Sequence, residues 1–229
     1  MQFQTIGIVG RIDKSETIST VVHVIELLRS RNLGVVLSNE LSKSLELSDI
    51  ECYPRDELGE FCDLVVVVGG DGSMLGAARD MCTCQVPVVG VNRGRLGFLT
   101  DVSPRELDVV LGDILDGKYR SEERALLDME LIRDQKNIIQ NSAFNDVVLS
   151  SNKAARMIEF EIYIDDVFVT HQRGDGLIIS TATGSTAYAL SAGGPILSPT
   201  LDAIVVLPMF PHKLSSRPIV IDGNSEIKL

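Results

Sequence analysis

The sequence predicts an α/β unit followed by a β-rich unit, and two changes of pattern carry that prediction. Strand and helix patterns alternate through the first half of the chain, which ends with a helix stopping at Gly117. From about Glu122 onward, apolar residues alternate with polar ones, as they do in antiparallel sheets. We therefore expect two domains, residues 1–120 and 121–229, that pack closely and leave a cleft between them.

Four apolar runs in the first half predict the strands of a sheet, namely residues 6–9, 35–37, 64–68 and 86–91. The third run contains four successive valines with no polar alternation, which fits a strand of a parallel sheet covered by helices on both faces. Residues 38–62 are polar and only weakly periodic, and we expect loop and short helix there.

Three helices are predicted in the first half, two between these strands and one after the last of them. The first begins at a capping box formed by Asp13 and Glu16 and ends near Asn32. Its predicted apolar face contains Ile18, Val21, Val22, Ile25 and Leu28. A short helix follows over residues 74–81. The third helix starts at Ser103-Pro104-Arg105-Glu106, and its buried stripe consists of Leu107, Val110, Leu111, Ile114 and Leu115.

The second half is predicted to be mostly β-structure. One strand has Ile158, Phe160, Ile162 and Ile164 on its apolar face. Asp165 and Asp166 then predict a hairpin turn. Residues 177–180 and 226–229 predict further strands. Because the chain stops in a strand, we expect this domain to be incomplete at its C-terminus.

The predicted strand over residues 64–68 runs into a turn that reads Gly69-Gly70-Asp71-Gly72. Glycines let backbone N–H groups approach a phosphate closely, and a helix starting near Ser73 adds its positive dipole end. Asp71 in such a place has two chemical uses: it holds a divalent cation or accepts a proton from an attacking hydroxyl. The alternative is a tight connection in which Asp71 only caps the helix. Neither standard phosphate-loop pattern matches this turn.

A second polar region covers residues 173–194, where Tyr188 lies among candidate hydroxyls and glycines, namely Thr181, Thr183, Ser185, Thr186, Ser191, Gly184, Gly193 and Gly194. Hydroxyls and close backbone approach suit the recognition of sugar and phosphate, and the tyrosine ring can stack on a base. A hydroxyl-rich helix cap followed by a helix of small residues is the structural alternative.

The composition of the chain limits the classes of molecule that it is expected to bind. The formal charge of −11 over 229 residues argues against nucleic acid and membrane surfaces. No apolar run is long enough to span a bilayer, so we expect a cytoplasmic protein. The four cysteines lack the spacing of a zinc site, and we expect them to be reduced thiols. The three histidines are scattered along the sequence, and none is a candidate for the catalytic base. An anionic ligand would need local help from a metal ion or from arginines, for which the candidates are Arg93, Arg95, Arg124, Arg156 and Arg173.

Several motifs occur together in a fixed order and resemble those of NAD kinases of the bacterial branch. They are Gly69-Gly-Asp-Gly-Ser, Asn92-Arg-Gly-Arg-Leu-Gly-Phe-Leu-Thr, Asn145-Asp-Val-Val, Asp175-Gly-Leu-Ile-Ile-Ser-Thr, Thr183-Gly-Ser-Thr-Ala-Tyr, Ala192-Gly-Gly-Pro-Ile-Leu and Leu207-Pro-Met-Phe-Pro-His. The resemblance implies a Rossmann-like α/β domain followed by a sandwich-like β-rich domain. It also implies transfer of the terminal phosphoryl group of ATP to the 2′-hydroxyl of the adenosine ribose of NAD. A divalent metal such as Mg²⁺ would assist, and a homodimer or homotetramer is implied.

The resemblance also assigns roles to positions of this chain. Asp71 becomes the proton acceptor beside the phosphate-binding glycines, and Asp175 falls near the nicotinamide. The remaining binding residues that it implies are Gly69, Gly70, Gly72, Phe98, Asn145, Asp146, Arg156, Arg173, Thr186, Ala187, Tyr188, Ala189, Leu190 and Ser191. It assigns no metal ligand.

The chain departs from the family pattern at two positions, with Gly174 where serine is usual and Ala182 where proline is usual. Both changes are expected to loosen the backbone and leave activity intact. Lipid kinases of the diacylglycerol type and phosphofructokinases share a similar glycine turn but lack the downstream motifs. A non-catalytic dinucleotide sensor is the other alternative, and retention of Asp71 argues against it.

Overall fold

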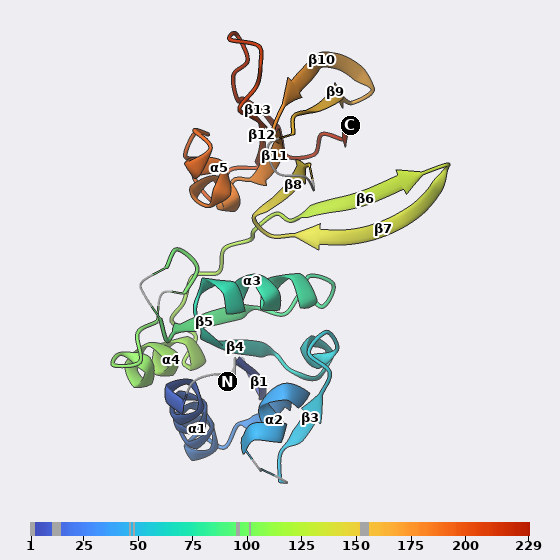
Figure 1. Ribbon diagram of the computed structural model, residues 1–229. Coiled ribbons are helices and arrows are strands. Elements are labelled where there is room, and N and C mark those ends of the chain that lie inside the picture. The colour runs from blue at the N-terminus through green and yellow to red at the C-terminus, as the bar shows by residue number, and fades with distance from the viewer. Residues whose placement is uncertain are drawn as a thin grey trace. The chain divides into compact units, whose positions relative to one another are not determined.

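The computed structural model in Figure 1 describes residues 3–10, 15–45, 47, 49–94, 97–100, 102–151 and 156–229. It divides into two compact units, Met1–Ser121 and Glu122–Leu229. The first unit is an α/β fold and the second consists mainly of antiparallel sheets, so the predicted fold class is confirmed. No helix in the described ranges is both long and apolar enough to cross a membrane.

The first unit is built on one parallel sheet of five strands in the order β3-β2-β1-β4-β5. These strands are β1 Thr5–Gly10, β2 Gly34–Ser38, β3 Glu51–Tyr53, β4 Leu64–Gly69 and β5 Val88–Asn92. The strand order reverses between β1 and β4, and such switch points are where open α/β sheets bind ligands, beyond the carboxyl ends of the strands. The Gly69-Gly70 turn leaves β4 at this point.

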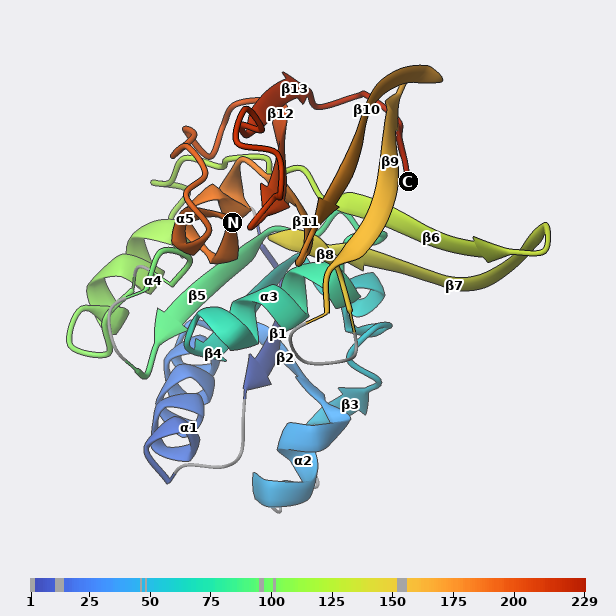
Figure 2. The same cartoon turned by 45° about the horizontal axis from the view of Figure 1, so that its top comes forward.

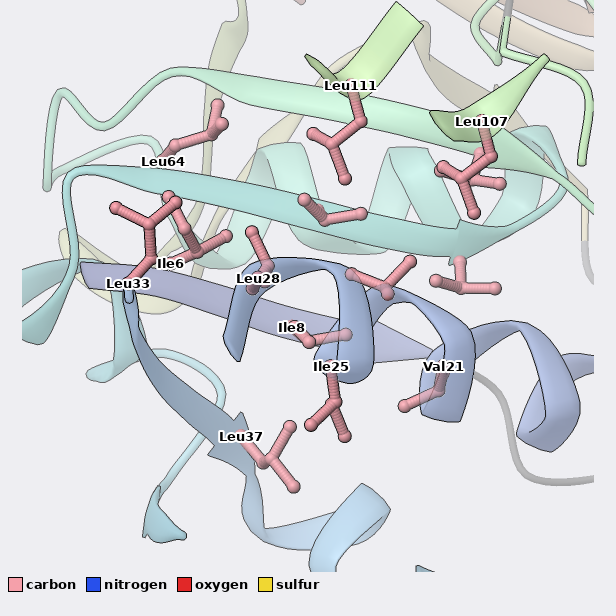
Figure 3. Packing of buried hydrophobic residues seen from close by; sticks show 14 of the residues in the cluster. Ile6, Ile8, Val21, Ile25, Leu28, Leu33, Leu37, Leu64, Leu107 and Leu111 are labelled. Carbon is pink, nitrogen blue, oxygen red and sulfur yellow. The ribbon is translucent and has the colours of Figure 1, made fainter. Parts of the chain in front are cut away.

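Helices cover both faces of this sheet. They are α1 Ser15–Ser30, α2 Asn39–Leu45, the short 3₁₀ helix η1 Leu58–Phe61, α3 Asp71–Asp80 and α4 Leu107–Leu115. Along β4, Val66 and Val68 pack with α1 and α4, whereas Val65 and Val67 pack with α3 and η1. Figure 3 shows the first of these layers, with Ile6 and Ile8 of β1 beneath helix side chains. The run of valines is therefore buried on both faces, as the sequence predicts.

Helix boundaries differ from the predictions in ways that have physical reasons. In α1 the buried stripe includes Val24, whereas Val22 is 38% exposed, so the predicted face is rotated slightly. Asn32 adopts the left-handed conformation after α1 and ends the helix as expected. The predicted capping residue Asp13 lies outside the described residues. The short edge strand β3 replaces the predicted loop, because three exposed or half-buried residues give no apolar signal.

The second unit contains two antiparallel sheets that face each other and a separate hairpin. The sheets have the orders β13-β12-β11-β8 and β10-β9-β14, and apolar residues of both form one core cluster. Their strands are β8 Asp146–Ser150, β9 Ile158–Ile164, β10 Val167–Gly174, β11 Gly176–Thr181, β12 Ala203–Met209, β13 Ile219–Asp222 and β14 Ile227–Lys228. The hairpin is formed by β6 Leu127–Arg133 and β7 Lys136–Ala143, drawn as a long ribbon in Figure 2.

Local signals in this unit correspond well to the structure. The apolar face predicted for residues 158–164 points into the core, and Asp165 and Asp166 take positive φ values in the tight turn between β9 and β10. After β11 come a second 3₁₀ helix, η2 Thr183–Thr186, and the single-turn helix α5 Tyr188–Ser191. The two short helices follow β11 directly, so the hydroxyl-rich residues 181–191 lie at the carboxyl end of that strand.

Candidate active site

The turn after β4 is shaped by its glycines. Gly69 is buried, and a Cβ there would overlap the Ser73 hydroxyl, so no side chain fits. Gly70 is the N-cap of α3 and makes no side-chain capping bond. A Cβ at Gly70 or Gly72 would meet no atom of the described residues within 4 Å. Packing does not demand glycine at these two positions, so their bare backbone leaves open space in which a ligand can approach the amides.

Asp71 is the first residue of α3, two residues earlier than the helix start predicted near Ser73. Its carboxylate bonds groups outside its own helix. The Phe98 amide donates to Oδ2 at 2.8 Å, and the Leu99 amide donates to Oδ1 at 3.1 Å. The Thr100 hydroxyl donates to Oδ1 at 3.3 Å. The alternative in which Asp71 only caps its helix is therefore wrong, because the side chain is fixed by a different segment.

That segment is the loop after β5, and it returns to lie beside its own strand. The Asn92 amide donates to the Val102 carbonyl at 2.8 Å, and the Val102 amide donates to the Gly90 carbonyl at 3.2 Å. The loop begins with a turn in which the Gly94 amide donates to Asn92 Oδ1 at 2.7 Å. Residues 97–100 are thereby brought against the Asp71 carboxylate. The Phe98 side chain is 75% exposed and points no apolar surface into the core.

In the second unit, the segment Asn145-Asp146 lies against the hydroxyl-rich turn. The Asn145 carbonyl accepts bonds from the Thr181 amide at 2.9 Å and from the Ser180 hydroxyl at 3.2 Å. The Thr181 hydroxyl also receives a bond from the Gly184 amide at 2.9 Å. A Cβ at Gly184 would overlap the backbone of Asn145. The Asn145 motif and the strand that begins at Asp175 are thus in contact, and Ser180 and Asn145, which form one of these bonds, are 35 residues apart in the sequence.

Asp146 begins β8 and pairs with Ser180 of β11. Burial raises the pKa of its carboxyl above the ordinary value of 3.8, and a hydrogen bond from the Tyr188 amide offsets part of that effect. A half-buried acid held next to backbone amides is a group that a ligand hydroxyl can bond once water is displaced.

The raised pKa of Asp146 predicts a stability difference. When the folded-state pKa lies above the unfolded one, the ionised carboxylate opposes folding at neutral pH, and the penalty vanishes at a pH where both states are protonated. Asp146→Asn should therefore unfold at higher temperature than the wild type at pH 7, and this gain should shrink as the pH falls toward 4. Thermal unfolding of both proteins at the two pH values measures it, and a gain that grows on acidification would contradict it.

The residues after this turn differ in accessibility. Tyr188 is 50% exposed, Leu190 and Ser191 are also exposed, and Thr186 and Ala187 are half-buried. Ala189 is fully buried and packs with Ile178 and Val205. The Ala189 side chain is therefore part of the core, and only its backbone is left for ligand contact. The exposed ring of Tyr188 remains accessible for stacking.

Asp175 lies between two glycines that pack tightly on either side. Its amide donates to the Met209 carbonyl at 3.0 Å, and its side chain is exposed. A Cβ at Gly174 would come within 2.7 Å of the Met209 carbonyl, and one at Gly176 would overlap the Leu149 carbonyl. The expectation that Gly174 merely loosens the backbone is therefore incomplete. A serine at this position would require the neighbouring strand to shift.

The arginines proposed for anion binding are distributed unevenly. Arg173 lies 3.6 Å from Glu159, Arg93 lies 3.7 Å from Glu16, and Arg124 is paired with Glu122. Arg156 is exposed, and Arg95 lies outside the described residues. Each of the three paired arginines would have to keep or exchange an acidic partner when it meets a phosphate.

Ala182 is the other departure from the family pattern, and its backbone suits proline. Its φ is −58°, close to the value that the proline ring imposes, and the preceding Thr181 is in a strand. Ala182→Pro should raise the free energy of unfolding by about 0.4–1 kcal/mol through the unfolded state. Urea denaturation measures this. Ala187→Pro is the matched control and should destabilise, because the Ala187 amide donates to the Gly184 carbonyl at 2.8 Å.

Sequence reasoning missed Leu99 and Thr100 as partners of Asp71. Both belong to the Asn92-Arg-Gly-Arg-Leu-Gly-Phe-Leu-Thr motif, so the signal was present in the pattern. What a single sequence does not contain is the return of the loop to β5, which alone brings these donors to the turn after β4. Gly97 was likewise missed, although a Cβ there would overlap the Asp71 carboxylate.

Within the described ranges, no group of three or more His, Cys, Asp or Glu side chains is arranged to hold a metal ion. Magnesium is usually bound through one or two carboxylates together with substrate phosphates and water. The described residues therefore fit a Mg²⁺ ion that is bound together with a nucleoside triphosphate. They do not fit a Mg²⁺ site in which all the ligands are protein side chains.

A carboxylate at the switch point of a parallel sheet, beside bare glycine amides and the N-terminus of α3, defines a phosphotransferase that acts on a nucleotide. Family models agree with this class. The ATP-NAD kinase N-terminal domain matches residues 6–119, and the ATP-NAD kinase C-terminal domain matches residues 144–229. The chain belongs to the ATP-NAD kinase family.

Individual relatives support the same assignment. An NAD kinase of Pseudomonas aeruginosa is 54% identical over 227 residues, which cover 99% of this chain and 77% of that protein. An NAD kinase of Pseudomonas fluorescens is 54% identical over 228 residues, again covering 77% of the relative. The crystal structure of yeast NADH kinase complexed with NADH is 29% identical with a TM-score of 0.90, covering 99% of this chain and 72% of that one. An NAD kinase from Archaeoglobus fulgidus in complex with ATP is 30% identical with a TM-score of 0.77, covering 98% and 79%.

Proposed function

We propose that this chain transfers the terminal phosphoryl group of ATP to the 2′-hydroxyl of the adenosine ribose of NAD, producing NADP and ADP. The observation that carries the proposal is the Asp71 carboxylate, which is held by two amides and a hydroxyl at the switch point of the sheet. A ribose hydroxyl becomes an effective nucleophile when its proton has a fixed destination. Asp71 supplies that destination.

The glycine turn supplies the binding site for the phosphates. Gly69, Gly70 and Gly72 leave their amides close to the N-terminus of α3, a ten-residue helix whose dipole favours negative charge. Phosphoryl transfer depends mainly on positioning and on neutralising charge. Mg²⁺ bound with ATP would neutralise charge on the triphosphate there. The residues of the turn orient the phosphate oxygens while Asp71 orients the hydroxyl.

The second unit supplies the groups that recognise the dinucleotide. Asn145 and Asp146 are proposed to bond the adenosine and its ribose, and the exposed ring of Tyr188 to stack beside the base. Asp175, with Arg156 and Arg173, would contact the nicotinamide side. The backbone and side chains of residues 186–191 complete the adenosine pocket, and Phe98 of the first unit would pack on a ring.

We also propose a cytoplasmic homodimer or homotetramer. The family resemblance supports the oligomer, and an acidic chain with unpaired thiols supports a reducing compartment. The net charge of −11 argues against nucleic acid and membrane surfaces as partners.

Turnover with purified protein tests the function. ATP, Mg²⁺ and NAD should give NADP, detected by a dehydrogenase that accepts NADP but not NAD, and omission of ATP should abolish the signal. NADH is the second acceptor to assay, because the yeast structure of similar fold is an NADH kinase with NADH bound. If the protein binds NAD but forms no phosphorylated product from either acceptor, it is a dinucleotide sensor and the proposed activity is wrong.

A further inference from the structure

We propose that Thr100 is a positioning residue that turns the Asp71 carboxylate so that Oδ2, and not Oδ1, accepts the proton of the attacking hydroxyl. The inference rests on the proposed function, since it concerns how the proton acceptor is aimed. It goes beyond that function because it assigns a role to a buried threonine and selects one of two carboxylate oxygens.

The donors are divided unequally between the two oxygens. Among the described residues, Oδ1 accepts from the Leu99 amide at 3.1 Å and from the Thr100 hydroxyl at 3.3 Å, whereas Oδ2 accepts from the Phe98 amide alone, at 2.8 Å. Each carboxylate oxygen has two lone pairs in the carboxylate plane. Oδ1 therefore has both lone pairs engaged, and Oδ2 keeps one for a substrate hydroxyl.

Thr100 is fixed by its surroundings. Its exposed fraction is 0%, and a Cβ at Gly90 would come within 2.7 Å of the Thr100 methyl carbon and 3.1 Å of its Cα. The β-bridge between Val91 and Val102 fixes the backbone two residues after Thr100. A fully buried side chain in a close-packed interior has little room to change χ1, so the hydroxyl oxygen of Thr100 keeps its direction.

The proposed step moves the ribose proton to Asp71 and the γ-phosphoryl group of ATP to the ribose oxygen. The 2′-O–H bond breaks and its proton moves to Oδ2 of Asp71, while the oxygen electron pair forms a bond to the γ-phosphorus of ATP. The bond from that phosphorus to the bridging β,γ oxygen breaks, and its electron pair leaves with ADP. The proton on Asp71 later passes to solvent. Without Thr100 the carboxylate can rotate about its χ2, and Oδ2 spends less time directed at the hydroxyl.

Two substitutions separate aiming from packing. Thr100→Val keeps the branched shape and the contact with Gly90 but removes the hydroxyl. Thr100→Ser keeps the hydroxyl and removes the methyl group. If Thr100 aims Asp71, the valine variant should lose about tenfold in kcat with the KM for NAD within about twofold, as expected for a lost hydrogen bond to a charged group. The serine variant should keep kcat within about twofold while its Tm falls.

The control is Thr20→Val on α1, where another buried threonine donates to the Glu16 carbonyl at 3.1 Å. Its kcat should equal that of the wild type. The proposal is overturned if Thr100→Val turns over normally, or if Thr100→Ser loses as much kcat as Thr100→Val. Wild-type protein that forms no NADP would instead refute the proposed function, so the two failures are distinguishable.

Discussion

Asp71→Asn should bind NAD with an affinity close to that of the wild type and lose roughly 10²- to 10⁴-fold in kcat, the range for a positioned base. The amide oxygen of asparagine can still accept one of the bonds from Phe98 and Leu99, so the loop keeps part of its attachment. The amide nitrogen, however, has no lone pair that can accept the ribose proton. Steady-state kinetics and calorimetric titration of NAD measure the two quantities separately.

Asp80→Asn is the control, because Asp80 lies at the other end of α3, where its carboxylate pairs with Arg55 at 2.8 Å and with Arg79 at 3.5 Å. This variant should keep near-normal turnover. Normal turnover of the Asp71 variant would remove that carboxylate from the mechanism. Loss of NAD binding along with turnover would indicate a structural role.

Gly97→Ala should lose about 10²-fold or more in kcat although no reacting group is removed. A Cβ at position 97 would overlap the Asp71 carboxylate, and the side chain must swing away to make room. Displacing a reacting group by about 1 Å is enough for a loss of this size. Because the obstacle is a side chain and not backbone, the fold should tolerate the change and Tm should fall by only a few degrees. Kinetics with thermal unfolding on the same sample provide both values.

Gly94→Ala is the matched control in the same loop. In the part of the chain that the structure describes, its added Cβ would meet Asn92 Oδ1 alone, at 3.7 Å, which is an ordinary contact. The control should retain turnover. Equal losses in the two variants would mean that loop flexibility, and not overlap with Asp71, governs the rate.

The sequence predicts the elements of the fold better than their edges. The valine run of β4, the stripe of α4 and the alternation in β9 were predictable because each buries several residues with a clear period. The edge strand β3 was not, because its exposed and half-buried side chains follow no period. The start of α3 was predicted two residues late because Gly70, and not a side chain, serves as its N-cap.

The candidate site was predictable in part. Asp71 and its glycines are noticeable because they follow a buried strand directly. Thr100 and Gly97 are not, since their roles depend on a loop that leaves β5 and returns to it. Hydrogen bonds between segments about 28 residues apart, such as that from Leu99 to Asp71, are set by tertiary packing, which local pattern reasoning does not reach.

The ring and the backbone amide of Phe98 face different surroundings. Its ring is exposed to solvent and accessible to a dinucleotide. The amide of the same residue donates a hydrogen bond to Oδ2 of Asp71. Under the proposed function, this residue would link substrate docking to the orientation of the proton acceptor. Swapping the aromatic ring at this position should alter affinity and rate together, so neither effect can be assigned to ring stacking alone.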